Sequence, residues 1–156
     1  HSLYLRGIIN HKSIKMKKLF YLLFFASTLS FAQDIEWDSN TTFEAIFDID
    51  AVHTRDGINY ELSASGDAGP YGKAYISYVF TNYNNSTSNG EFTGFAWTQM
   101  GEDIVRATLQ GVYRKEGKVF KMYSYDNTTD DNKIMIVSGV VDFVAQTMKF
   151  KVSPLK

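Results

Sequence analysis

Aromatic side chains that also carry a polar group are the most abundant residues in this sequence with a capacity for ligand chemistry. The chain contains ten Tyr, twelve Phe and two Trp. Such rings offer a large contact area, and a hydroxyl or indole N–H can fix a ligand's orientation. We take five of them as candidate ligand-binding residues: Tyr75, Trp97, Tyr113, Tyr123 and Tyr125. They are predicted to line a cavity or to form a stacking platform for sugars, and packing in the core is the alternative that requires no ligand.

Acidic side chains between residues 44 and 50 suggest a second kind of chemistry. Glu44, Asp48 and Asp50 fall on one face of an alternating segment. Paired carboxylates are the groups that acid–base glycoside chemistry uses, but carboxylates on an exposed strand face are usually just solvated. His53 is the one His after residue 32, so a multi-histidine metal site is excluded. We recognise no catalytic set of residues.

A run of oxygen-bearing side chains resembles the start of a calcium loop. Asp126, Thr128, Asp130 and Asn132 stand at alternate positions. An EF-hand is excluded, because the sixth position is not Gly and the twelfth, Val137, is not Glu. A weaker calcium site and a plain solvated hairpin loop remain as alternatives. We predict neither a resident metal nor a cofactor.

The elements that must position these residues are strands. Apolar residues alternate with polar ones, and β-branched and aromatic residues are frequent. From Thr42 to Asp50, for example, the apolar side chains point one way and the acids the other, with Ile46 as the exception. Turn residues divide the rest at short intervals. The predicted strands are Thr42–Asp50, Ile58–Ser65, Lys73–Asn82, Glu91–Thr98, Ile104–Arg114, Lys118–Tyr125, Lys133–Val144 and Met148–Ser153.

Eight sequential strands without a helix predict an all-β fold. Short connections favour pairing of successive strands, and closure removes exposed sheet edges. We therefore expect a single eight-stranded antiparallel β-barrel, with a β-sandwich as the alternative. Several strands are apolar on both faces, so the sequence does not decide which side chains point inward.

The N-terminal region predicts export. Residues 16–32 combine two lysines after a Met, an apolar stretch and the small residues of a cleavage site, as a secretory signal peptide does. Residues 1–15 are interpreted as upstream sequence or a mis-called leader. The folded domain is then residues 33–156, without a membrane span after cleavage. A short signal with two lysines is typical of bacteria, and we expect a secreted or periplasmic protein.

Removing the signal changes the charge of the protein. Residues 1–32 hold five of the sixteen Lys and Arg but none of the seventeen Asp and Glu, which leaves a formal charge of −6. A domain with this net negative charge repels phosphate backbones, so nucleic acid is not an expected partner. It contains no Cys, so disulfides, thiol nucleophiles and thiolate metal sites are excluded.

Glycines at the ends of the predicted hairpins carry a family resemblance. The runs Gly66–Tyr75 and Asn89–Gly94, followed by Gly111 and Gly117, resemble the allene oxide cyclase and dirigent-like barrels. That resemblance covers the segment from Gly66 to Asp142 and implies a barrel whose cavity takes apolar or aromatic molecules. No cyclase residue can be carried over, and the lack of Cys departs from the plant cyclase pocket.

Three functions follow as hypotheses. The first is a secreted barrel that binds a small apolar or aromatic molecule, motivated by export, strand pattern and aromatic content. The second is a cyclase or isomerase that works in the barrel cavity. The third is a carbohydrate-binding or adhesive module, which requires Trp97 and several Tyr on an exposed face. The oligomeric state is not predicted.

Overall fold

The computed structural model describes residues 34–156. The signal peptide predicted for residues 16–32 and the leader predicted for residues 1–15 lie outside the described residues. Within residues 34–156, no helix is long and apolar enough to cross a membrane.

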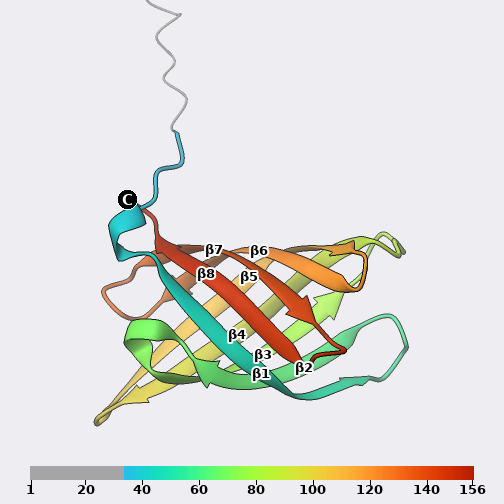
Figure 1. Ribbon diagram of the computed structural model, residues 1–156, viewed down its shortest axis with the longest axis horizontal. Coiled ribbons are helices and arrows are strands. Elements are labelled where there is room, and N and C mark those ends of the chain that lie inside the picture. Colours follow the sequence, from blue (N-terminus) through green and yellow to red (C-terminus); the bar gives the residue numbers. More distant parts are fainter. Residues whose placement is uncertain (1–33) are drawn as a thin grey trace, which may run out of the picture. The chain divides into compact units, whose positions relative to one another are not determined.

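The described chain is a closed antiparallel barrel in which each strand pairs with its sequence neighbours and β1 closes the ring against β8 (Figure 1). The predicted all-β fold and eight-stranded barrel are confirmed, and the sandwich alternative is not adopted. Two single turns of 3-10 helix, η1 (Ser39–Thr41) and η2 (Gly69–Tyr71), accompany the strands. The strands are β1 (Phe43–Thr54), β2 (Tyr60–Asp67), β3 (Lys73–Thr81), β4 (Asn89–Met100), β5 (Asp103–Glu116), β6 (Val119–Thr128), β7 (Ile134–Asp142) and β8 (Thr147–Pro154).

Alternation places the apolar residues inside. In β1, Ala45, Phe47 and Ile49 are buried, while Ile46 is 47% exposed. Ile46 is thus an outward apolar residue that breaks the pattern without entering the core. β3 and β6 show the same alternation, because successive side chains of a strand point to opposite faces.

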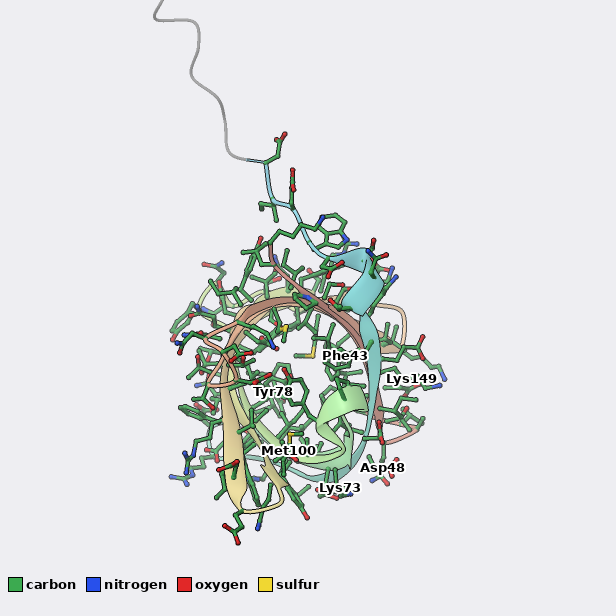
Figure 2. The ribbon with its side chains drawn as sticks, turned by 90° about the vertical axis from the view of Figure 1, so that its left-hand side faces the viewer. Phe43, Asp48, Lys73, Tyr78, Met100 and Lys149 are labelled. Carbon is green, nitrogen blue, oxygen red and sulfur yellow. The ribbon has the colours of Figure 1, made fainter. Side chains whose placement is uncertain are left out.

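The barrel has two different ends, which we call the mouth and the capped end. The mouth is formed by the four hairpins that join β1 to β2, β3 to β4, β5 to β6 and β7 to β8. At the capped end, η2 packs against β1, and the Phe43 and Tyr71 rings meet edge to face with centroids 5.9 Å apart. Figure 2 shows Phe43 and Tyr78 inside the ring of strands and Lys149 and Asp48 outside it.

The middle of the interior is densely filled. A layer of side chains below the mouth is at most 2% exposed and lines neither of the interior cavities described below: Leu62, Phe92, Met122, Val141 and Met148. Side chains buried to this degree are the part of a protein interior that packs about as densely as an organic crystal. We call this layer the plug, because it separates a cavity at the mouth from a smaller chamber near the capped end.

Gly139 allows one part of this close packing. A Cβ built there would lie 2.0 Å from Cδ1 of Phe150 on the neighbouring strand and 2.6 Å from a backbone oxygen. The missing side chain therefore lets the Phe150 ring lie against the β7 backbone.

Candidate ligand-binding mouth

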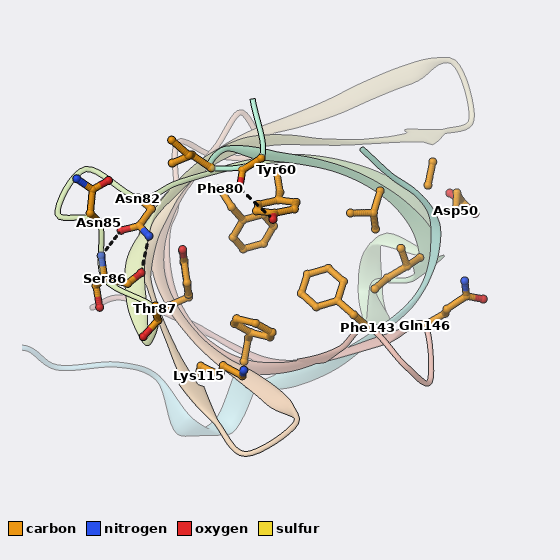
Figure 3. A pocket seen from close by; sticks show the side chains of 17 residues that line it. Asp50, Tyr60, Phe80, Asn82, Asn85, Ser86, Thr87, Lys115, Phe143 and Gln146 are labelled. Carbon is orange, nitrogen blue, oxygen red and sulfur yellow. Dashed lines mark hydrogen bonds between the residues drawn. The ribbon is translucent and has the colours of Figure 1, made fainter. Parts of the chain in front are cut away.

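A cavity of about 780 Å³ opens at the mouth of the barrel. Its volume lies within the roughly 300–1,000 Å³ of small-molecule sites in proteins. All four mouth hairpins contribute to its lining, so its shape depends on barrel closure rather than on one loop. Figure 3 shows Phe80 and Phe143 inside the ring and polar side chains around its edge.

Four aromatic rings form the floor of the cavity. Phe80 contacts Tyr113 and Phe143 with ring centroids 5.5 and 6.4 Å apart. Phe120 contacts the same two residues at 5.9 and 5.2 Å. Each of these contacts is edge to face, the arrangement that the ring quadrupoles favour. We call these four residues the aromatic floor.

Tyr113 adds a polar group to the floor. A Cβ at Gly90 on the paired strand would lie 2.5 Å from the Tyr113 hydroxyl oxygen, so the glycine makes room for that hydroxyl. Burial raises the pKa of Tyr113, and the charge of Glu91 acts in the same direction. The hydroxyl therefore remains protonated at neutral pH and can donate a hydrogen bond to a ligand.

A β-bulge shapes one wall. The register of β1 against β2 shifts between Ile49 and Ala51, which makes Asp50 the extra residue. After the shift, Val52 pairs with Leu62, whose side chain points inward. The bulge therefore directs the Val52 side chain to the interior of the barrel. Val52 is 44% exposed and lines the cavity together with Ile49 and Ile58. Bulges commonly re-aim side chains in this way next to functional sites.

The rim is polar and partly fixed by its own hydrogen bonds. Within the loop between β3 and β4, the Asn82 side chain accepts from the Ser86 backbone N–H at 2.8 Å and donates to the Ser86 carbonyl (Figure 3). On the neighbouring β1–β2 hairpin, the Tyr60 hydroxyl donates to the Gly57 carbonyl at 3.2 Å. Further polar side chains of the lining are Asp50, Asn85, Thr87, Lys115 and Gln146.

The Asp56 carboxylate holds the β1–β2 hairpin at this rim. It accepts from the backbone N–H groups of Ile58 at 2.9 Å and Asn59 at 2.7 Å, and from the Asn59 amide at 2.7 Å. These bonds, the Asn59 N–H first, lower the pKa of Asp56 to about 2. The turn therefore keeps its carboxylate partner at any physiological pH.

Of the five ring residues predicted as ligand contacts, the structure brings only Tyr113 to the cavity. Tyr75, Trp97, Tyr123 and Tyr125 are 41–47% exposed on the outer surface. Packing in the core, their predicted alternative, is therefore wrong for these four. The reason is strand parity: in β3, for example, Tyr78 is buried and Tyr75, three positions earlier, points outward.

Two of these outer rings form a pair. Tyr75 and Trp97 are opposite each other on β3 and β4 and stack with centroids 4.5 Å apart and planes 21° apart. The Lys73 ammonium lies 5.8 Å from the centre of the Tyr75 ring. Tyr123 and Tyr125 are on β6, with β5 between them and this pair.

The acidic candidates lie apart from a common site. Glu44 and Asp48 are exposed on β1, and Asp50 accepts a hydrogen bond from Ser65 at 3.3 Å. His53 is exposed, with Nε2 2.9 Å from an oxygen of Glu61. These positions match solvated groups rather than a carboxylate pair around a substrate.

The run from Asp126 to Asn132 does not form a single ligand set. Asp126 lines the interior chamber, whereas Asp130 accepts from the Tyr71 hydroxyl at 3.0 Å and from Lys133 at 3.2 Å. Within the described barrel, no group of three His, Cys, Asp or Glu side chains is placed to hold a metal.

Sequence reasoning missed two features. Phe80, Phe120 and Phe143 belong to the floor, although no spacing in the sequence marks them, because they meet only when the barrel closes. Asp126 is the other: the pattern of β6, with Met122 and Ser124 buried at alternate positions, puts it on the inward face. An acid at an inward position was the available signal.

The mouth brings apolar and polar side chains together around one cavity. It combines a ring-lined floor, aliphatic walls and a rim of amide, hydroxyl and single charged groups. Comparisons with protein-family models, curated proteins and solved structures find no match to this chain. The resemblance to allene oxide cyclase and dirigent-like barrels therefore stays a prediction.

Proposed function

We propose that this protein is an exported barrel that binds a small molecule with an apolar or aromatic body in the mouth cavity. The observation that carries the proposal is the aromatic floor at the base of a cavity of about 780 Å³. Rings of a ligand gain both buried apolar area and edge-to-face contacts there. The Tyr113 hydroxyl and the amides of the rim supply the orientation.

Binding of 2-naphthol, which has two fused rings and one hydroxyl, tests this proposal through the change in its own fluorescence. Val52→Trp places a large side chain in the cavity and is expected to weaken binding at least about tenfold. Val79→Trp is the matched control, because Val79 is 42% exposed on the outside of β3, close to the 44% of Val52. Equal binding by both variants, or no saturable binding to the unaltered protein, would contradict the proposal.

A specific observation also supports a second function, binding of a carbohydrate on the outer surface. The stacked pair of Tyr75 and Trp97 is exposed, and Phe95, 65% exposed, is two residues from Trp97 on the same strand. Exposed rings supply the stacking surfaces that sugars use. Trp97→Ala should then reduce retention on insoluble polysaccharide, whereas Trp37→Ala should not, although Trp37 is 54% exposed. Loss in neither variant or in both equally would count against a platform at Trp97.

A further inference from the structure

The chamber near the capped end combines two features that are individually unfavourable. It is a space of about 100 Å³ lined by residues of β1 and of β3 to β8. It also contains Asp126, whose Oδ1 is buried and has no hydrogen-bond partner in the part of the chain that the structure describes. Empty space forfeits packing contacts, and an unpaired buried carboxylate oxygen loses its hydration without compensation.

Small side chains create the space. Five alanines line it, contributed by β1, β3, β4, β5 and the residue before η2: Ala45, Ala74, Ala96, Ala107 and Ala68. At the mouth end, inward positions hold Phe80, Tyr113 and Phe120 instead. The alanines thus leave space among the larger side chains that line the chamber, which include Phe47, Tyr78 and Phe150.

Asp126 is the main polar side chain of the chamber. Of the sixteen residues that line the chamber, only Asp126, Tyr71 and Tyr78 carry polar side chains. The Tyr71 hydroxyl is engaged by Asp130. An apolar pocket with a few convergent polar groups is the usual form of a small-ligand site, and an unsatisfied buried atom requires an explanation.

We propose that the chamber is a second binding site, for a compact apolar molecule of about one ring that donates a hydrogen bond from a hydroxyl or N–H to Asp126. A space of this order admits a few waters or a benzene-sized molecule. The donor would satisfy Oδ1, and the alanine, Met135 and Leu109 side chains would contact the rest of the ligand. This site is separated from the mouth by the plug, so its ligand is distinct from that of the mouth.

Entry to the chamber is at the capped end. Phe43, Ala68 and Tyr71 belong to its lining, and η2 is held by hydrogen bonds from Thr98 to the Tyr71 carbonyl at 3.0 Å and from Tyr71 to Asp130. These bonds and the contact between the Phe43 and Tyr71 rings have to open for a ligand to enter.

The test compares phenol with toluene, which have nearly the same size and differ in the donor. The reporter is the NMR methyl resonance of Met135, which lines the chamber. The methyl resonance of Met100, which is 46% exposed, serves as the internal control. The sample is the protein as purified after processing in the cell. The titrations are made at pH 8, where Asp126 is ionised, and the raised pKa values of Tyr71 and Tyr78 keep both tyrosines protonated.

Phenol is expected to shift the Met135 methyl saturably and to bind at least about tenfold more tightly than toluene, because its bond to the carboxylate is charge-assisted. Asp126→Leu should abolish that preference, and Asp126→Asn, which preserves the size of the side chain, should reduce it. Asp48→Leu, on the outer face of β1, should leave it unchanged.

No saturable shift at Met135, equal binding of the two probes, or an unchanged preference in both Asp126 variants would overturn the proposal. Should the Leu variant not fold, the Asn variant decides alone. Val52→Trp at the mouth separates this result from the proposed function: it should block 2-naphthol and leave phenol binding at Met135 intact.

Discussion

The Phe120 and Phe143 rings meet edge to face, with centroids 5.2 Å apart and planes 82° apart, although they come from different hairpins. This contact links the β5–β6 and β7–β8 hairpins beneath the mouth cavity. The same rings therefore serve as part of the core and as the surface that a ligand meets.

Phe143→Ala is expected to affect both stability and binding. Loss of the partly buried ring should lower the free energy of unfolding by about 2 kcal/mol, because its contacts with Phe80 and Phe120 disappear. It should also weaken 2-naphthol binding. Urea denaturation and the fluorescence titration measure the two effects. Phe95→Ala is the control: Phe95 is 65% exposed, and its loss should change stability by less than about 0.5 kcal/mol.

Asp126 makes stability depend on pH in an unusual direction. Burial raises its pKa from 3.8 to about 7, and the Ser124 hydroxyl acts in the opposite direction. Between these two values the unfolded chain has lost the proton that the folded protein still binds, so stability falls as the pH rises from about 4 to about 7. At about 1.4 kcal/mol per pH unit, the contribution amounts to at most roughly 4 kcal/mol.

Asp126→Asn should remove this contribution, since the amide does not titrate in that range. Denaturation of both proteins at pH 4.5, 6 and 7.5 measures it. The variant should gain stability relative to the unaltered protein as the pH increases. A difference that stays constant over that range would show that Asp126 titrates as an ordinary carboxyl group.

Gly139→Ala tests the close approach of β7 and β8. The new Cβ would overlap both the Phe150 ring and the Lys149 carbonyl oxygen, so a backbone shift is required. We expect a loss of about 1–3 kcal/mol in unfolding free energy. Ser138→Ala changes the adjacent, outward position and should be nearly neutral. Similar losses in both variants would contradict a steric origin.

The cap at η2 is predicted to depend on the Tyr71 hydroxyl. Its hydrogen bond is the largest cause of the lowered pKa of Asp130, followed by that of Lys133. Tyr71→Phe should therefore raise the pKa of Asp130, which the carboxyl carbon resonance measures by NMR. It should also speed hydrogen exchange of the Gly72 amide, which donates to the Gly69 carbonyl within the turn. Unchanged values for both would show that the cap is held without this bond.

The fold was accessible from the sequence because its signals are local. Alternation over Phe43, Ala45, Phe47 and Ile49 predicts the buried face of β1, and short turns predict sequential pairing. Strand ends differed most at the C-terminal ends of β1 and β6: β1 continues past the predicted Asp50 to Thr54, and β6 continues past the predicted Tyr125 to Thr128.

The site was less accessible, because it depends on strand parity and closure. Trp97 and Tyr75 could face either way in strands that are apolar on both sides, and register decides that they stack outside. The aromatic floor joins residues from three hairpins that no local pattern relates. The bulge at Asp50, which reverses the parity of the rest of β1, has no distinctive residue in the sequence.

A crystal structure of the protein grown with 2-naphthol tests the central claim most directly. The predicted result is the naphthol ring on the floor formed by Phe80, Tyr113, Phe120 and Phe143, with its hydroxyl directed to Tyr113 or the rim. A mouth occupied only by water, with the naphthol bound instead against Tyr75 and Trp97 on the outer surface, would contradict it.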